Sequence, residues 1–136
     1  MTYKFQNLEI YKLALEYIDL IYSLAEKLPR SEDFNLKSQI TRAGTSIVLN
    51  IAEGSTSQSD AEQSRFLGMA LRSLIETVAC QDVIERRKYV TVEDLRAARE
   101  LGSKLFAKVQ AMKRFLSHPN ASEDLSARRS PVVRPS

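Results

Sequence analysis

Apolar residues recur at spacings of three and four along most of the chain, which is the pattern of helices that bury one face. The first such segment runs over residues 8–27 and stops before a proline, Pro29. Three more segments follow, over residues 31–54, 59–88 and 91–116. Long helices joined by short loops pack as antiparallel neighbours. The pattern therefore predicts an all-α fold, an antiparallel up-and-down four-helix bundle.

The same apolar pattern predicts which side chains form the core. The stripes are regular on the first, second and fourth segments, and on the third they cover a broader face that includes Phe66, Leu74 and Ile75. Apolar side chains outside a core stripe need cover from another surface. On the second and third segments these outlying residues are Phe34, Val48, Leu49, Ala52, Met69 and Val83.

Local signals mark the helix ends. Ser59 and Glu62 form the S-x-x-E pattern of a capping box, and Thr91 and Asp94 have the same spacing. Gly54 follows the second apolar stripe, at a place where a glycine in the left-handed conformation commonly ends a helix. We therefore expect helices to begin after Ser59 and Thr91, and the second helix to end at Gly54.

The periodic pattern stops after Leu116, and the remaining residues are rich in serine, arginine and proline. We therefore expect one domain over residues 1–116 and a disordered tail over residues 117–136. No apolar stretch is long enough to span a bilayer, and the N-terminus lacks an apolar signal region. The single cysteine, Cys80, suits a reducing compartment. These features predict a cytoplasmic protein.

An enzyme needs a nucleophile with a base, a metal cluster or a phosphate-binding loop, and the sequence has none of these patterns. His118 is the only histidine and stands beside Pro119, while Cys80 has no basic residue on the same helical face. The four glycines stand singly and form no phosphate loop. We therefore expect no catalytic residue, no metal and no cofactor.

The charge distribution suggests a weak attraction to phosphate. The formal net charge is +3, and the basic excess lies in residues 59–116. An excess of this size is far from the dense basic face of a dedicated nucleic-acid binder, so the alternative is a surface that is merely solvated. The candidate phosphate contacts lie at the end of the third helix and along the fourth: Arg86, Arg87, Lys88, Arg96, Arg99, Lys104 and Lys108.

A polar row on the second helix suggests a second contact face. Its four members are spaced four, four and three residues apart, so they lie along one side of the helix, and the third helix offers two charged residues at a spacing of four. The alternative is an ordinary row of solvent-facing side chains. Because apolar residues flank the row, we favour an oligomer interface. Its candidate residues are Arg42, Ser46, Leu49, Asn50, Glu53, Arg72 and Glu76.

The run from Leu28 to Ala43, followed by Ser46 to Gly54, resembles the intervening-sequence protein family of bacterial 23S rRNA genes. The sequence departs from the family's pattern at Arg72, where a small residue is expected. Further matching positions extend the resemblance over about residues 5–116: Phe5 to Leu8, Phe66, Leu67, Ala70, Ser73, Glu76 and Tyr89.

The resemblance implies an antiparallel four-helix bundle that assembles into a homopentameric ring with a central channel and has no established enzymatic activity. The family is similar in turn to the accessory variability proteins of diversity-generating retroelements, which associate with a reverse transcriptase and with nucleic acid. The implied partners are therefore other copies of the chain, RNA or DNA, and a reverse transcriptase or another protein.

The residues and the resemblance together favour a non-enzymatic oligomeric scaffold. We expect it to bind nucleic acid, or a nucleic-acid enzyme, through its weakly basic surface. The alternative is a protein–protein interaction module with no nucleic-acid role. An enzyme is the least favoured interpretation, because no residues have the spacing of a ligand or metal site.

Overall fold

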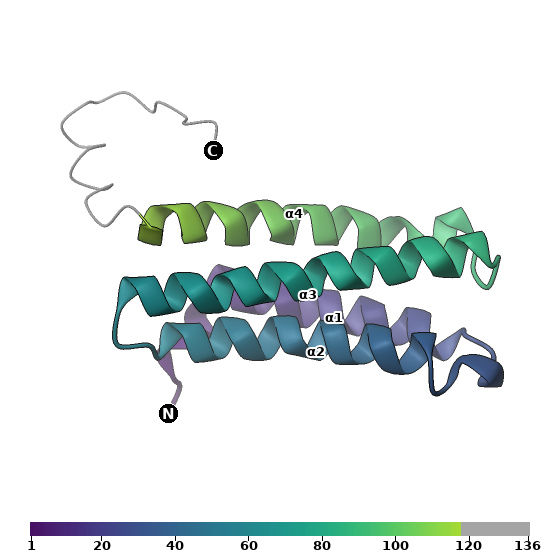
Figure 1. Ribbon diagram of the computed structural model, residues 1–136, viewed down its shortest axis with the longest axis horizontal. Helices are drawn as coiled ribbons and strands as arrows, with labels where there is room; N and C mark the ends of the chain where they lie inside the picture. Colours follow the sequence, from purple (N-terminus) through teal and green to yellow (C-terminus); the bar gives the residue numbers. More distant parts are fainter. Residues whose placement is uncertain (118–136) are drawn as a thin grey trace, which may run out of the picture.

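The computed structural model describes residues 1–117, and these form an all-α fold with four helices and no strand (Figure 1). The helices run antiparallel, and each contacts the next along the chain, while α4 returns to contact α1. The four-helix prediction is therefore confirmed. The elements are the 3-10 turns η1 (Lys4–Asn7) and η2 (Arg30–Glu32), and the helices α1 (Glu9–Glu26), α2 (Leu36–Ser55), α3 (Asp60–Arg86) and α4 (Val92–Ser117).

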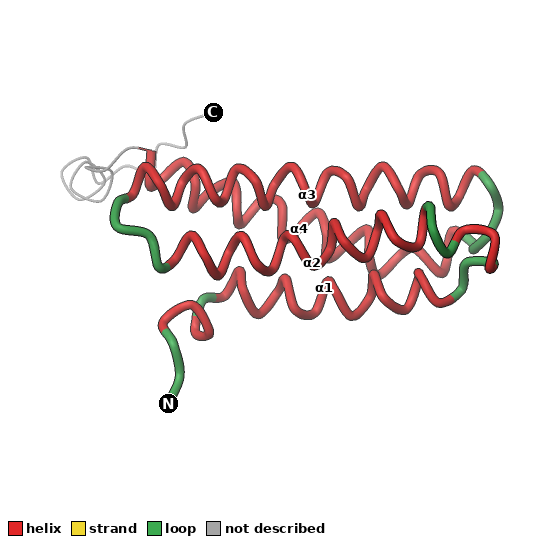
Figure 2. Tube along the Cα trace, turned by 60° about the horizontal axis from the view of Figure 1, so that its bottom comes forward, coloured by secondary structure: helices red, strands yellow, loops and turns green. Residues whose placement is uncertain are grey.

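The connections gather at the two ends of the bundle. The α1–α2 and α3–α4 connections share one end, and the α2–α3 connection lies at the other end with the start of α1 and the end of α4 (Figures 1 and 2). Segments far apart in sequence, namely residues 27–35 and 87–91, are thereby brought to the same end of the molecule.

The core follows the predicted apolar stripes. Burying each large aliphatic side chain contributes about 1.5–3 kcal/mol, so these residues supply most of the favourable free energy of folding. Every position expected on the core stripe of α2 is buried. The largest apolar side chains with almost no exposed surface are Tyr17, Ile21, Ile40, Ile47, Ile51, Leu67, Leu74, Ile84, Leu95, Leu105 and Val109.

The predicted burial of two apolar residues is wrong. Val48 was expected outside the core but is only 7% exposed. It follows Gly44 by one turn on the side of α2 that faces α1, and Gly44 lies so close to Ile21 that α1 covers this side. Ile75 was expected in the core but is 52% exposed, because α2 and α4 flank α3 and neither covers this direction.

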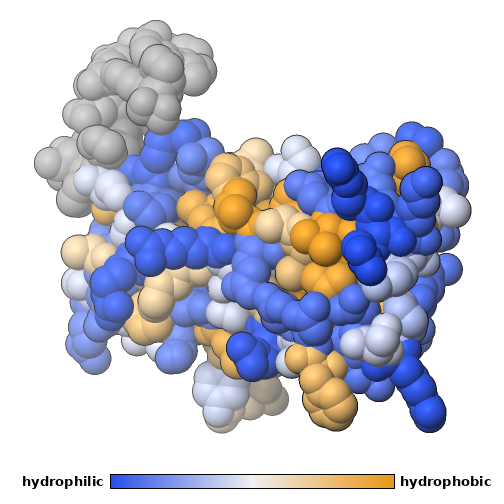
Figure 3. Space-filling view, turned by 45° about the vertical axis from the view of Figure 1, so that its right-hand side comes forward, coloured by the Kyte–Doolittle hydropathy of each residue, from blue (hydrophilic) through white to orange (hydrophobic). Residues whose placement is uncertain are grey.

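Ile75 instead lines a mainly apolar hollow of about 270 Å³ between α3 and α4, with Val78 and Phe106 among its walls. Apolar surface gathers on the upper part of this side of the molecule, over α3 and α4, with polar side chains around it (Figure 3). The sequence pattern gave no sign of this hollow, since the same residues fit a core stripe equally well.

The caps predicted for α3 and α4 are present. Ser59 Oγ accepts a hydrogen bond from the Glu62 backbone N–H at 3.1 Å, although Glu62 accepts from the Gln58 N–H, at 3.4 Å, rather than from Ser59. Thr91 and Asp94 form a reciprocal capping box with two bonds of 3.0 Å. These local signals could be read correctly because each cap involves residues no more than four positions apart.

The start of α2 differs from the prediction. Residues around Ser31 were expected to open the helix, but they form the η2 turn, and α2 begins at Leu36. Glu32 explains the delay, because its carboxylate accepts hydrogen bonds from Asn35 Nδ2 at 3.0 Å and from the Leu36 backbone N–H at 3.4 Å. A side chain outside the helix thus supplies an acceptor for its first turn.

The prediction that Gly54 is a left-handed terminator is wrong. None of the four glycines has a positive φ, and Gly54 lies buried inside α2. A Cβ at Gly54 would lie 3.0 Å from the Cβ of Phe66 on α3. The missing side chain therefore allows α2 and α3 to approach closely, which is a tertiary requirement and not a helix-ending one.

A buried polar cluster joins α1 to α3 across the core. The Tyr17 hydroxyl lies 2.7 Å from Thr77 Oγ1 and accepts a hydrogen bond from Gln81 Nε2 at 2.9 Å. Gly102 on α4 provides the space, since a Cβ there would lie 3.0 Å from the Tyr17 ring. The only sequence signal for this cluster is that Thr77 and Gln81 occur in phase with the apolar stripe of α3.

Candidate subunit and nucleic-acid interfaces

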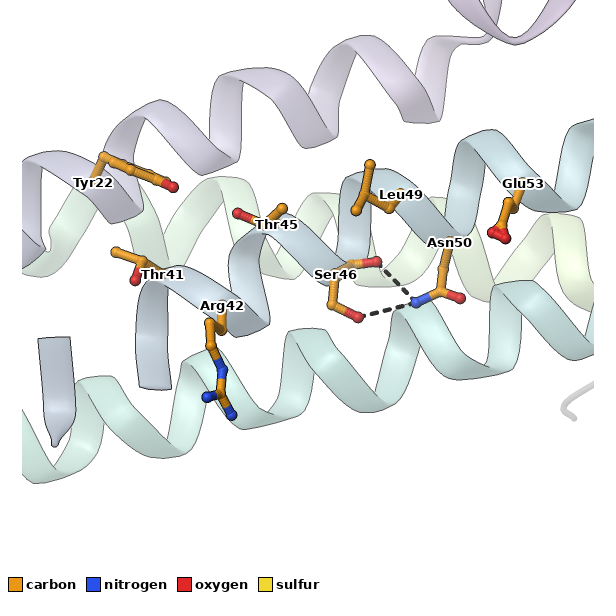
Figure 4. Close-up of a pocket in the computed structure, with 8 residues that line it drawn as sticks. All are labelled: Tyr22, Thr41, Arg42, Thr45, Ser46, Leu49, Asn50 and Glu53. Atoms are coloured by element: carbon orange, nitrogen blue, oxygen red, sulfur yellow. Dashed lines mark hydrogen bonds between the residues drawn. The ribbon is translucent and has the colours of Figure 1, made fainter. Parts of the chain in front are cut away.

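The polar row predicted on α2 lines one shallow hollow of about 430 Å³ (Figure 4). Arg42, Ser46, Asn50 and Glu53 all contribute to it, so the predicted alignment along one side of the helix is observed. The hollow also includes Tyr22 of α1, which sequence reasoning missed. The complete lining consists of Tyr22, Thr41, Arg42, Thr45, Ser46, Leu49, Asn50 and Glu53.

The inner part of this row is bonded within the chain. Asn50 Nδ2 donates to the Ser46 backbone oxygen at 2.9 Å and to Ser46 Oγ at 3.0 Å, as Figure 4 shows. Ser73 on α3 donates to the same Ser46 hydroxyl at 2.8 Å. Ser46 therefore fixes Asn50 on one side and ties α2 to α3 on the other, which leaves these groups little freedom to bind elsewhere.

The outer part of the row is exposed. Arg42 and Glu53 lie on the surface and form no ion pair within residues 1–117. Leu49 lies between them and is 58% exposed, and the nearby Tyr22 is 47% exposed. An exposed apolar pair flanked by two opposite charges has the composition of a protein contact surface.

Arg72 and Glu76 are exposed one turn apart on α3. They are neighbours of the α2 row along the α2–α3 contact, because Ser73, next to Arg72, bonds to Ser46. Arg72 is the position where the family's pattern has a small residue. The arginine side chain lies at the surface, and the Ser73–Ser46 bond forms beside it.

The C-terminal end of α3 presents three of the predicted cations. Arg86, Arg87 and Lys88 are all exposed. Lys88 has a φ of 63°, the only positive φ of a non-glycine residue in the described part of the chain. Its N–H bonds to the Glu85 oxygen at 2.9 Å, and the Tyr89 N–H bonds to the oxygen five residues earlier, at 3.1 Å. These two bonds form a Schellman motif with lysine where glycine is usual.

Tyr89 connects this end of α3 to the η2 turn. Its hydroxyl donates to Glu32 Oε2 at 2.8 Å, and the Arg87 guanidinium lies 6.0 Å from the centre of its ring. The hydrogen bond from Tyr89 is the main reason that the pKa of Glu32 lies below its usual value. Hydrogen bonding to Tyr89 likewise raises the pKa of Arg87. The two connections at this end are therefore joined through one tyrosine.

Most of the predicted cations on α4 are paired with carboxylates. Arg99 bridges to Asp82 at 3.0 Å and to Glu85 at 2.9 Å. Arg96 pairs with Glu93 at 2.9 Å and Lys108 with Glu9 at 3.4 Å, while Lys104 is exposed without an ion pair in the described residues. The seven predicted cations therefore do not form one continuous basic face, and those without a carboxylate partner are Arg86, Arg87, Lys88 and Lys104.

Candidates for chemistry are few in the described part of the chain. Cys80 is buried, and burial raises the pKa of its thiol, with Glu76 adding to the effect, so the reactive thiolate is disfavoured. Residues 1–117 contain no group of three His, Cys, Asp or Glu side chains placed to hold a metal ion. His118 and the predicted tail beyond it lie outside the described residues. Within residues 1–117, no helix is sufficiently long and apolar to cross a membrane.

The hollow between α3 and α4 contains one further unusual group. Gln81 contributes to its lining and is almost completely buried, and its Oε1 has no hydrogen-bond partner among the described residues. Arg99, held by Asp82 and Glu85, lines the same hollow. Apart from Ser103, the rest of the lining is apolar.

Comparison with known proteins agrees with this architecture. A comparison with curated proteins gives no match. Among solved structures, the chain is similar to a protein of unknown function from the S23 ribosomal protein family of Bacteroides thetaiotaomicron VPI-5482. The two share 27% sequence identity with a TM-score of 0.71, over 76% of this chain and 97% of the other. Residues 6–111 match the family model described as 23S rRNA-intervening sequence protein, and the chain therefore belongs to that family.

Proposed function

We propose that the chain is a non-enzymatic oligomeric scaffold of the cytoplasm that binds nucleic acid through the end of the bundle where α3 meets α4. The observation that carries the proposal is the exposure of Arg86 and Lys88 without carboxylate partners. Unpaired cations on a fixed backbone attract phosphate, whereas paired ones such as Arg99 are largely neutralised.

The oligomer is the second part of the proposal. The exposed Leu49 and Tyr22 lie in one hollow beside Arg42 and Glu53, and a second copy covering this surface would bury the apolar pair and supply partners for both charges. A homopentameric ring is the assembly that the family resemblance implies. Light scattering tests it directly, because a mass equal to one 15.4 kDa chain at micromolar concentration would contradict the proposed interface.

Salt dependence of binding tests the nucleic-acid role. The affinity of the full-length chain for a structured RNA and a duplex DNA should fall steeply with salt, with a slope of roughly 0.9 per phosphate contacted. Reversing Arg86 and Lys88 to glutamate should reduce that slope by about two per bound chain. The matched control reverses two exposed cations outside the candidate contacts, Lys4 of η1 and Lys12 near the start of α1. Absence of binding to either nucleic acid, even at low salt, would refute the proposal.

A protein partner without nucleic acid is the second candidate. It is favoured by the pairing of Arg96, Arg99 and Lys108 with carboxylates, which reduces the basic surface available to phosphate. In this case, reversal of Arg86 and Lys88 should leave partner binding intact, while substitutions at Arg42 and Glu53 should abolish it.

A further inference from the structure

Phe34 is exposed to an unusual degree. Phe34 is 99% exposed and lies in the short segment between η2 and α2. The other exposed aromatic residues of the described chain are less exposed, with Tyr3 at 61%, Tyr22 at 47% and Phe115 at 45%. A phenylalanine ring in water gains no stabilisation from the hydrophobic effect. Because almost all of the Phe34 side chain is exposed, both faces of its ring are available to a ligand.

The backbone that carries Phe34 is held on both sides. The Asp33 N–H bonds to the Arg30 oxygen at 3.0 Å, and the Asn35 N–H bonds to the Glu32 oxygen at 3.1 Å. Asn35 is anchored further by Gln39, whose Nε2 donates to Asn35 Oδ1 at 2.8 Å. An exposed ring on a tethered backbone loses less conformational entropy on binding than one on a loose loop.

Cations without carboxylate partners lie at the same end of the bundle. The bond from Tyr89 to Glu32 joins the segment of Phe34 to the end of α3, where Arg86 and Lys88 are exposed, and Arg30 is exposed in η2 itself. The carboxylates at this end are mostly engaged, with Glu26 as the exposed exception. Those bonded or paired within the chain are Glu32, Asp33, Asp82, Glu85, Glu93 and Asp94.

Lys88 supplies an independent observation. Its left-handed backbone conformation is one that glycine adopts without penalty and that a residue with a side chain adopts at a cost. A lysine at this position retains a cation that the turn does not need. Backbone strain of this kind gathers at sites where the side chain serves a function.

An exposed aromatic ring beside unpaired cations matches the chemistry of single-stranded nucleic acid. An unpaired base has a face that stacks on such a ring, and the phosphates on either side are attracted to the cations. A duplex hides its base faces in its own stack and presents its phosphates, sugars and base edges instead. We propose that this end of the bundle binds single-stranded nucleic acid, with Phe34 stacked on an unpaired base and Arg30, Arg86 and Lys88 facing phosphates. The inference rests on the proposed function and narrows its ligand.

Fluorescence provides the direct test, because the chain contains no tryptophan. In the full-length Phe34→Trp variant, a single-stranded oligonucleotide should quench the tryptophan emission as a base stacks on the indole. The matched control is Phe115→Trp, which places the same fluorophore at another exposed phenylalanine, 45% exposed on α4 and outside the α2 hollow. Its emission should not change with the oligonucleotide.

Affinity provides the second arm. Phe34→Ala and Phe34→Leu should both weaken binding of a single strand by about tenfold and leave binding of the matching duplex unchanged. The leucine variant keeps apolar bulk and removes only the aromatic face. Lys88→Gly should weaken binding of both forms, because both present phosphates.

The outcomes separate this inference from the proposed function. If the parent chain binds a single strand but neither Phe34 variant loses affinity and the tryptophan is not quenched, stacking is wrong while nucleic-acid binding stands. If Phe34→Ala lowers the mass measured by light scattering, the ring is a subunit contact and the inference fails. If the parent binds no nucleic acid at low salt, both proposals fail together.

Discussion

The outer surface of α2 and the end of the bundle around Tyr89 differ in which of their groups already have partners. On α2 the polar groups of Ser46 and Asn50 are bonded within the chain, and the apolar Leu49 is exposed. Around Tyr89 most carboxylates are bonded or paired, while the cations Arg86 and Lys88 have no carboxylate partner. The exposed apolar residue on α2 suits contact with a protein surface. The unpaired cations around Tyr89 suit contact with an anion such as phosphate.

The largest effect is expected from a charge placed on the α2 surface. Leu49→Asp should raise the dissociation constant of the oligomer by more than about a hundredfold, since burying an unpaired carboxylate costs several kcal/mol. Light scattering over a dilution series measures this. Phe115→Asp, at an exposed apolar position on α4 outside the hollow, is the control and should keep the parent's mass. A Leu49→Asp variant with the parent's mass would show that α2 is not the contact surface.

Gly54 and Gly44 should respond oppositely to alanine. A Cβ at Gly54 would lie 3.0 Å from the Phe66 Cβ, so Gly54→Ala should destabilise the fold by about 1–3 kcal/mol. At Gly44 the nearest atom, Ile21 Cγ2, is 3.4 Å away, and Gly44→Ala should be neutral or stabilising by up to about 1 kcal/mol. Urea unfolding distinguishes the two. Equal effects would mean that the α2–α3 approach, which positions the α2 row, is less tight than the structure indicates.

Removing the Tyr89 hydroxyl should change how the stability of the fold depends on pH. The pKa of Glu32 is lowered in the folded chain, so its hydrogen bonds stabilise the fold above the ordinary value of 4.5 and lose their effect as pH falls through the folded pKa. Tyr89→Phe should therefore lower the thermal midpoint at neutral pH, and the difference from the parent should shrink in acid. A constant difference from neutral to acid pH would argue against Glu32 as the partner that matters.

The smallest effect is expected at Lys88, where one substitution should raise the stability of the fold while weakening the binding of nucleic acid. Lys88→Gly should stabilise the fold by about 0.5–1 kcal/mol, because glycine adopts the positive φ without a Cβ clash. Lys88→Ala removes the same charge but keeps the clash, so only the glycine variant should gain stability in thermal unfolding. If both variants unfold like the parent, the left-handed conformation carries no strain.

Local features of the sequence were sufficient to predict the number of helices and the caps of α3 and α4, although not the two ends of α2. Ser59 caps α3, and the Thr91–Asp94 box opens α4, as predicted, because these bonds join residues three apart. The α2 row was also predictable, since helix periodicity alone aligns positions 42, 46, 50 and 53. Tyr22 was missed because it belongs to another helix, and periodicity along one helix says nothing about its neighbours.

The sequence by itself therefore determined the all-α class, the number of helices and the polar row of α2, all of which follow from contacts within one or two turns. Only the tertiary structure decided that Gly54 serves the approach of α2 to α3, that Thr77 and Gln81 meet Tyr17 in the core, and that Arg99 is neutralised by Asp82 and Glu85. These contacts join residues on different helices, and their partners are set by how the helices pack and not by spacing along the chain.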